Sequence, residues 1–144
     1  MSNKEESMGV LIGVTRRMML KKLNEGLAEH QIPLSLEQFL FISTIRNHDQ
    51  NMTQQELANQ TCKDKSAVLR TIDILENKGL VERKLDPADR RKNFIVLTPK
   101  CHELFTVLGE IESAVMEQLK EGISSEDYEA MVRVMHQIQK NANK

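Results

Sequence analysis

Ten basic side chains gather in the middle of this chain, where together they could neutralise the charge of a polyanion. They lie between residues 61 and 100, which hold only six acidic residues, so this segment carries a net charge of +4. The rest of the 144-residue chain has 10 basic and 15 acidic residues, a net charge of −5. A cationic segment on an anionic chain is typical of a polyanion-binding surface, because released counterions drive that association. A solvated charged surface explains the charges equally well when they are taken alone.

Two clusters in this segment carry side chains that could contact a nucleic acid. The first lies on the opening turns of a predicted helix, with Lys65, Ser66, Leu69 and Arg70 facing outward. The second is the run Arg90, Arg91 and Lys92 at the tip of a predicted hairpin. A helix fits the wide major groove of duplex DNA, and an arginine on a loop suits the narrow, strongly negative minor groove.

Helix-start motifs locate the elements that must position the first cluster. Ser35-Leu36-Glu37-Gln38 and Thr53-Gln54-Gln55-Glu56 are capping boxes, and each predicts a helix that begins there. Asp64 can cap the next helix, which ends at Gly79, where glycine can adopt a left-handed conformation. A short helix, a tight turn and a second helix with a basic start are typical of a helix-turn-helix, although many helical hairpins look alike.

The second cluster lies between two predicted strands. Residues 80–85 alternate in character, residues 94–97 are rich in β-formers, and Asp86-Pro87-Ala88-Asp89 forms a turn between them. A cationic hairpin beside a basic helix predicts a winged helix.

Long amphipathic helices flank this lobe. Apolar residues recur every three or four positions over residues 8–31 and again over 99–142, where Thr98-Pro99 opens the first of two helices. One small domain has limited apolar surface to cover them, so a partner subunit is the simplest cover; packing on their own chain is the alternative. We therefore predict a mainly α (α+β) chain, with a winged helix-turn-helix DNA-binding lobe at 35–98 and long N- and C-terminal dimerisation helices.

Composition and motifs argue against several other classes. Two cysteines, Cys62 and Cys101, are too few for a disulfide scaffold, and neither a leader nor an apolar run of about 20 residues occurs, so we expect a cytoplasmic chain outside the membrane. The four histidines are scattered, so no metal site is expected. No catalytic motif or phosphate loop appears, so we expect neither an enzyme nor a cofactor. A winged helix that binds another protein remains the main alternative.

Three motifs around the hairpin have a specific spacing: Gly79-Leu80-Val81-Glu82-Arg83, Asp86-Pro87-Ala88-Asp89-Arg90-Arg91 and Ile95-Val96-Leu97-Thr98. Together they resemble the signature of the MarR family of bacterial and archaeal transcriptional regulators. The resemblance extends over nearly the whole chain, because the helix order and the two long C-terminal helices also agree. Residues 1–144 are accordingly expected to form a single MarR-type domain.

The resemblance implies a homodimer whose two lobes bind an inverted-repeat operator in double-stranded DNA, commonly as a repressor. It implies that the helix beginning near Lys65 is the recognition helix, that Arg91 enters the minor groove and that Asp89 orients this arginine. The DNA-binding residues expected on this basis are Thr53, Lys63, Lys65, Ser66, Ala67, Leu69, Arg70, Arg90, Arg91 and Lys92.

The resemblance also implies regulation by a small aromatic or phenolic anion, bound between the helical dimer region and the DNA-binding lobe. We interpret Met18, Met19 and Leu20, near the expected subunit core, as packing rather than as a pocket. The family's peroxide sensors use a cysteine in the first helix, and this chain has none there. Cys62 is interpreted as a small buried side chain. The role of Cys101, which stands where the family often has glycine, is left open.

Overall fold

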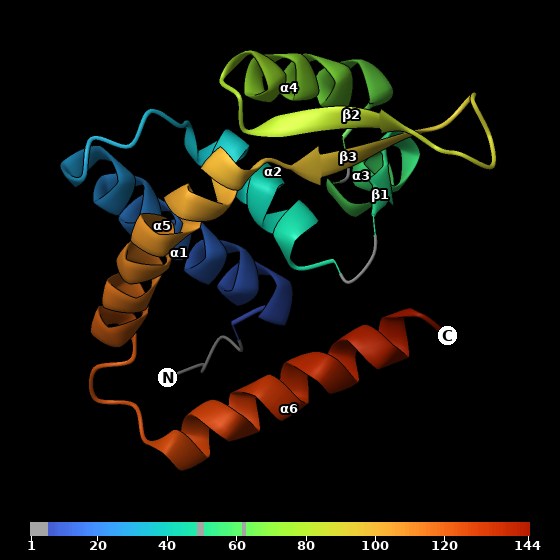
Figure 1. The fold of residues 1–144 in the computed structure, drawn as a ribbon. Coiled ribbons are helices and arrows are strands. Elements are labelled where there is room, and N and C mark those ends of the chain that lie inside the picture. The colour runs from blue at the N-terminus through green and yellow to red at the C-terminus, as the bar shows by residue number, and fades with distance from the viewer. Residues whose placement is uncertain (1–5, 49–50, 62) are drawn as a thin grey trace.

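The computed structural model describes residues 6–48, 51–61 and 63–144, and Figure 1 shows a helical body with a small antiparallel sheet on one side. The elements in chain order are α1 (Met8–Glu29), α2 (Leu36–Arg46), β1 (Met52–Thr53), α3 (Gln54–Thr61), α4 (Lys65–Asn77), β2 (Val81–Leu85), β3 (Asn93–Leu97), α5 (Pro99–Leu119) and α6 (Ser125–Ala142). This order confirms the predicted mainly α winged-helix fold with long terminal helices. In the described part of the chain, the helices are too short or too polar to cross a bilayer.

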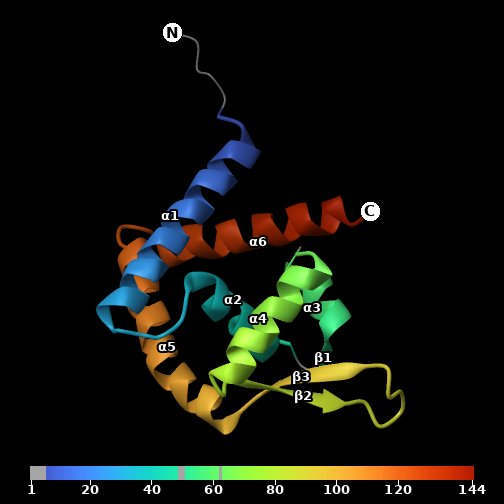
Figure 2. The same cartoon turned by 90° about the horizontal axis from the view of Figure 1, so that it is seen from above.

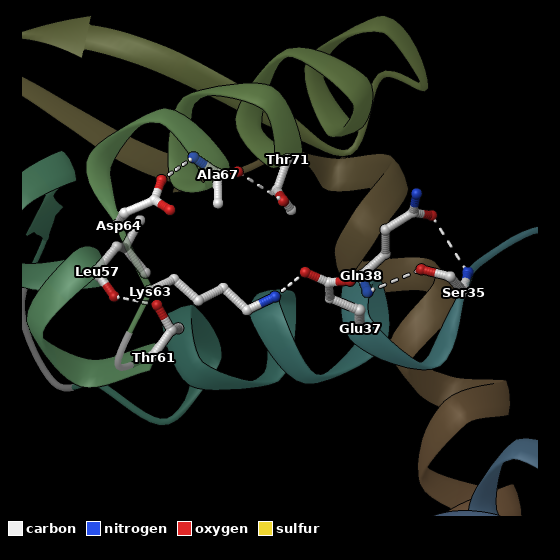
Figure 3. Close-up of polar contacts among 9 residues, drawn as sticks. All are labelled: Ser35, Glu37, Gln38, Leu57, Thr61, Lys63, Asp64, Ala67 and Thr71. Atoms are coloured by element: carbon white, nitrogen blue, oxygen red, sulfur yellow. Dashed lines mark hydrogen bonds and ion pairs between the residues drawn. The ribbon is translucent and has the colours of Figure 1, made fainter.

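Side-chain caps start the helices of the lobe where the sequence predicts them. Ser35 Oγ accepts a hydrogen bond from the Gln38 backbone N–H at 3.1 Å, and the Gln38 side chain accepts one from the Ser35 N–H at 3.2 Å (Figure 3). Thr53 and Glu56 exchange the same pair of bonds, at 3.1 and 2.9 Å. Asp64 accepts a bond of 2.7 Å from the first turn of α4. Each cap satisfies a backbone donor that the first turn leaves without a helical partner.

A glycine turn joins the end of α4 to β2. Gly79 has a φ of +74°, a left-handed conformation that side chains rarely adopt. The Leu80 N–H donates back to the Leu75 carbonyl at 2.9 Å, and both side chains are buried. The Thr98 hydroxyl donates to the Gly79 carbonyl at 2.6 Å while accepting from the Cys101 N–H at 3.2 Å. The start of α5 is thereby fixed to the end of α4.

The sheet has three strands in the order β1-β3-β2, all antiparallel. β2 and β3 pair from Val81↔Leu97 to Leu85↔Asn93, which confirms the predicted hairpin. The sequence predicts two strands only, and the structure adds β1, where Met52 pairs with Ile95. A two-residue strand has no periodicity by which a sequence pattern could reveal it.

One apolar core joins the lobe to α1 and α5. Every element of the lobe contributes, and α1 and α5 add Leu27, Leu108 and Ile111, all buried. In contrast, no residue of α6 is buried, and Figure 1 shows this helix lying apart from the lobe.

Candidate nucleic-acid interface

Helix α4 presents a polar, cationic face to solvent and an apolar face to the core. Val68, Ile72 and Leu75 are fully buried on the inner face. The predicted recognition residues of the first turns lie on the other side: Lys65, Ser66 and Arg70 are exposed, and Ala67 and Leu69 are half-buried. The structure therefore brings these five residues together on one surface that a major groove could accept.

Lys63, two residues before α4 begins, points away from that surface. Its ammonium group forms an ion pair with Glu37 on α2, and the Lys63 side chain is 30% exposed. Figure 3 shows the lysine reaching sideways from the end of α3 to the start of α2. The sequence offers no signal for this pair, because 25 residues separate its members along the chain.

Thr53 lies at the junction of β1 and α3 and is half-buried. Its hydroxyl oxygen accepts the capping bond from Glu56, so the hydroxyl proton can still be donated to an acceptor such as a phosphate. The predicted capping role of Thr53 is confirmed, and phosphate contact stays a prediction.

The loop between β2 and β3, called the wing here (residues 86–92), carries the second cluster. Arg90, Arg91 and Lys92 are all exposed. The Asp89 carboxylate accepts a hydrogen bond from the Arg91 backbone N–H at 3.0 Å, and the Asp89 carbonyl accepts one from the Lys92 N–H at 3.0 Å. Asp89 thus holds the main chain of Arg91 in this structure. That it also orients the guanidinium group stays a prediction.

Arg83 joins β2 of the hairpin to α4, although its residue type and spacing alone assign it no role. One guanidinium nitrogen donates to Asp73 Oδ1 at 2.6 Å and another to Glu76 Oε1 at 2.9 Å. Both acids lie on α4, three residues apart and therefore on one side of the helix. The sequence gives no signal for this contact, because it depends on how β2 packs against α4.

A cavity of about 750 Å³ lies beside the lobe, lined by residues of α1, α2, α3 and α5 together with Lys63. Its charged lining residues are Arg16, Glu37, Lys63 and Glu112. The Ser43 hydroxyl, also on its lining, is buried and lacks a hydrogen-bond partner among the described residues. The cavity combines apolar walls with a few charged and polar groups, as small-molecule sites do.

The predicted packing of the methionines of α1 is not seen within this chain. Met18 is 61% exposed, and Met19 is 38% exposed. Met19 and Leu20 line an open hollow of about 320 Å³ between α1 and α5, whose other lining residues are apolar except Glu112.

Cys101 is buried at the start of α5, and Cys62 lies outside the described residues. Burial raises the pKa of the Cys101 thiol to about 11, against a smaller lowering effect of Arg46. A buried thiol with a raised pKa is a poor nucleophile, because the thiolate is the reactive form. Among the described residues, no three His, Cys, Asp or Glu side chains converge as a metal site would require.

Residues 34–92 of the chain match the model of the MarR family, from two residues before α2 to the end of the wing. The transcriptional regulator PA3341 is 28% identical, with a TM-score of 0.83 over 95% of this chain and 98% of that one. MarR of E. coli in its apo form is 23% identical, with a TM-score of 0.79 over 94% and 98% of the two chains.

A further solved structure belongs to BpsR of Bordetella bronchiseptica, whose DNA binding is regulated by 6-hydroxynicotinic acid. It is 19% identical, with a TM-score of 0.78 over 96% of this chain and 97% of that one. At this identity, and at that of E. coli MarR, the likeness is one of fold.

Proposed function

This chain belongs to the MarR family, and from that premise we propose that it is a sequence-specific DNA-binding regulator, a repressor that acts as a homodimer in the cytoplasm. One observation carries the proposal: exposed cations occupy both the outer face of α4 and the wing. The wing extends beyond the sheet on the side where α4 begins (Figures 1 and 2). This arrangement supports the proposal that helix and wing contact adjacent grooves of one duplex.

Each cluster has a distinct task in this proposal. Arg70 and Ser66 read base edges in the major groove, where an arginine can bind guanine with two hydrogen bonds. Arg91 enters the minor groove, where its charge meets the strongest negative potential. Lys65, Arg90 and Lys92 contact phosphates, which sets the register of the protein on the duplex but carries no sequence information.

The unpartnered apolar surfaces support the homodimer. Val10, Leu11 and Met18 of α1 are more than half exposed, as is Val134 of α6. A second copy that covers these side chains would place two lobes side by side. They would then bind the two halves of an inverted repeat, with centres about 34–36 Å apart.

The cavity beside α2 is the candidate effector site. It lies between α1 and α5 on one side and the lobe on the other, so a ligand there touches both units. A ligand that prefers one spacing of the two lobes would shift the population toward that spacing and change operator affinity. A small aromatic anion fits this site: Arg16 and Lys63 offer cations, and Leu36, Leu40 and Phe41 offer apolar contacts.

Selection of bound sequences from a random duplex pool tests the DNA-binding proposal. We expect a recovered inverted repeat, which would establish DNA binding and two-fold symmetry together. Arg70→Ala and Arg91→Ala should each weaken binding of that duplex, at a cost of about 1–3 kcal/mol for an arginine that reads bases. Lys140→Ala, an exposed cation near the end of α6, is the matched control and should bind normally. Unchanged affinity in both arginine variants would contradict the proposal and favour a protein partner.

A further inference from the structure

We propose that Arg83 is a positioning residue, which fixes the wing relative to α4 so that both contact the same duplex. The inference rests on the proposed DNA-binding function and extends it to a residue that itself lies off the DNA-contacting surface. Its subject is the bracket, defined here as the Arg83 side chain together with Asp73 and Glu76.

The bracket joins β2 to α4 through two charge-assisted hydrogen bonds. Arg83 Nη2 lies 2.6 Å from Asp73 Oδ1, and Nη1 lies 2.9 Å from Glu76 Oε1. The Arg83 side chain is 24% exposed, whereas those of Asp73 and Glu76 are 62% and 42% exposed, so the bracket lies at the surface and solvent screens it in part. The two terminal nitrogens of the planar guanidinium group therefore bind two carboxylates on α4, which restricts rotation of β2 against the helix.

The position of Arg83 along the hairpin gives the bracket its effect on the wing. Val81 and Ile95 are buried in the core, and β1 pairs with β3 at Ile95 and Phe94, so β3 is held by a neighbouring strand whereas β2 is the edge strand beside α4. Beyond Arg83, the side chains of Lys84 and Leu85 are exposed, so they add no packing against the lobe. Among the described residues, Arg83 makes the side-chain hydrogen bonds between α4 and the hairpin. Without them, we expect β2 and the wing to move more freely against α4.

A purely electrostatic role is the competing explanation, because Arg83 also neutralises two carboxylates on the helix that approaches DNA. The two roles predict different contributions of Arg91 when the carboxylates themselves are removed, because charge alone leaves that contribution unchanged. Asp73→Asn with Glu76→Gln deletes two negative charges, which by charge alone raises affinity for a phosphate backbone. By positioning, the same double variant frees the wing, so Arg91 contributes less to binding.

The first experiment measures how much Arg91 contributes with and without the bracket, using the inverted-repeat duplex recovered by selection. In the otherwise unaltered chain, Arg91→Ala should weaken binding about tenfold, within the range for a single base-reading arginine. In an Arg83→Gln background, and in the Asp73→Asn/Glu76→Gln background, the same change should weaken binding less than about twofold. Arg70→Ala is the matched control, and it should keep its full effect because α4 remains in place.

Arg83→Lys separates geometry from charge. Lysine keeps the positive charge but cannot reach both carboxylates with a planar fork. We expect the contribution of Arg91 to stay small in this background. If Arg83→Lys keeps the full contribution of Arg91 to binding, the bracket acts through charge and the positioning role is overturned.

A second measurement needs no DNA. Hydrogen exchange of the backbone amides of the wing should accelerate at least severalfold in Arg83→Gln, while amides of α5 keep their rates and the thermal melt confirms folding. Unchanged exchange in the wing would overturn the proposal. An equal cost of Arg91→Ala with and without the bracket would overturn it too, with the proposed function intact. If neither Arg91→Ala nor Arg70→Ala has an effect in the unaltered chain, the DNA-binding proposal fails and the exchange measurement alone decides the role of Arg83.

Discussion

At the scale of single residues, ion pairs decide which cations are available to a polyanion. Of the ten basic residues between 61 and 100, Lys63 and Arg83 are engaged by acidic side chains, whereas Arg70 and the wing cations are exposed. Counting charges along the sequence treats all ten alike. The structure divides them into cations that hold the lobe together and cations that face solvent.

Glu37→Gln should strengthen DNA binding by releasing Lys63. The neutral amide no longer neutralises the lysine, whose ammonium can then contact a phosphate beside the start of α4. We expect a several-fold gain in affinity at low salt, and a salt dependence of log K steeper by about one counterion. Duplex titrations at several salt concentrations measure both quantities. In a Lys63→Gln background the gain should largely vanish, and an unchanged salt slope would contradict the prediction.

Because burial raises the pKa of the Cys101 thiol, we expect the fold to lose stability at alkaline pH. Its folded-state pKa of about 11 exceeds the ordinary value of 9.0, so the folded state holds the thiol proton more tightly than the unfolded state does. The stabilisation is therefore complete below about pH 9 and is lost as the pH rises toward 11. Cys101→Ala removes the titrating thiol and with it this pH-dependent stabilisation. The difference in free energy of unfolding between wild type and variant should therefore narrow as the pH rises from 9 to 11. Denaturant unfolding at pH 8, 9, 10 and 11 measures it, and a constant difference would refute the prediction.

At the scale of elements, local signals were predictable and distant contacts were not. Ser35, Asp64 and Thr98 cap their helices as the sequence predicts, because a cap and its partner lie within three residues. The pairing of β1 with β3, the Lys63–Glu37 ion pair and the bracket join segments that only the fold brings together. The cationic residues of the candidate interface were therefore predictable from the sequence, but their partners were not.

Where α1 packs on α5, replacing glycine by alanine should change stability in opposite directions at two positions. A Cβ added at Gly26 of α1 would lie 2.8 Å from Cγ2 of the buried Ile111, so either this side chain or the packing of the two helices must shift. Gly26→Ala should therefore destabilise the fold by about 1–3 kcal/mol, as overpacking does. A Cβ at Gly109 of α5 would meet nothing within 4 Å, so Gly109→Ala should stabilise it by up to about 1 kcal/mol. Denaturant unfolding of both variants measures the difference, and equal effects would contradict the packing argument.

At the scale of the whole molecule, charge and apolar surface are separated. The lobe carries the cations, whereas the terminal helices carry exposed apolar side chains that the chain leaves uncovered. Burying them would gain roughly 25 cal/mol for each Å² of apolar surface removed from water. The uncovered apolar surface is clearest on α6, because this helix is strongly amphipathic and yet has no buried residue. The domain boundaries at 8–31, 35–98 and 99–142 stay a prediction, since they assign dimerisation to helices described here in a single chain.

Val134→Glu should dissociate the dimer and weaken operator binding together. Val134 lies on the apolar stripe of α6 with Met131 and Ile138, and a carboxylate there could be buried against a partner only at a large desolvation cost. His136→Glu also adds a carboxylate, but two residues from Val134 and therefore on another side of the helix, so it is the matched control and should remain dimeric. Sedimentation equilibrium measures the association, and duplex titration measures the binding. Because a monomer places one lobe rather than two on the inverted repeat, its affinity should fall steeply in step with the dimer fraction. A Val134→Glu protein that stays dimeric would show that α6 packs on its own chain in solution, whereas a monomer with undiminished affinity would remove the need for two-fold symmetry.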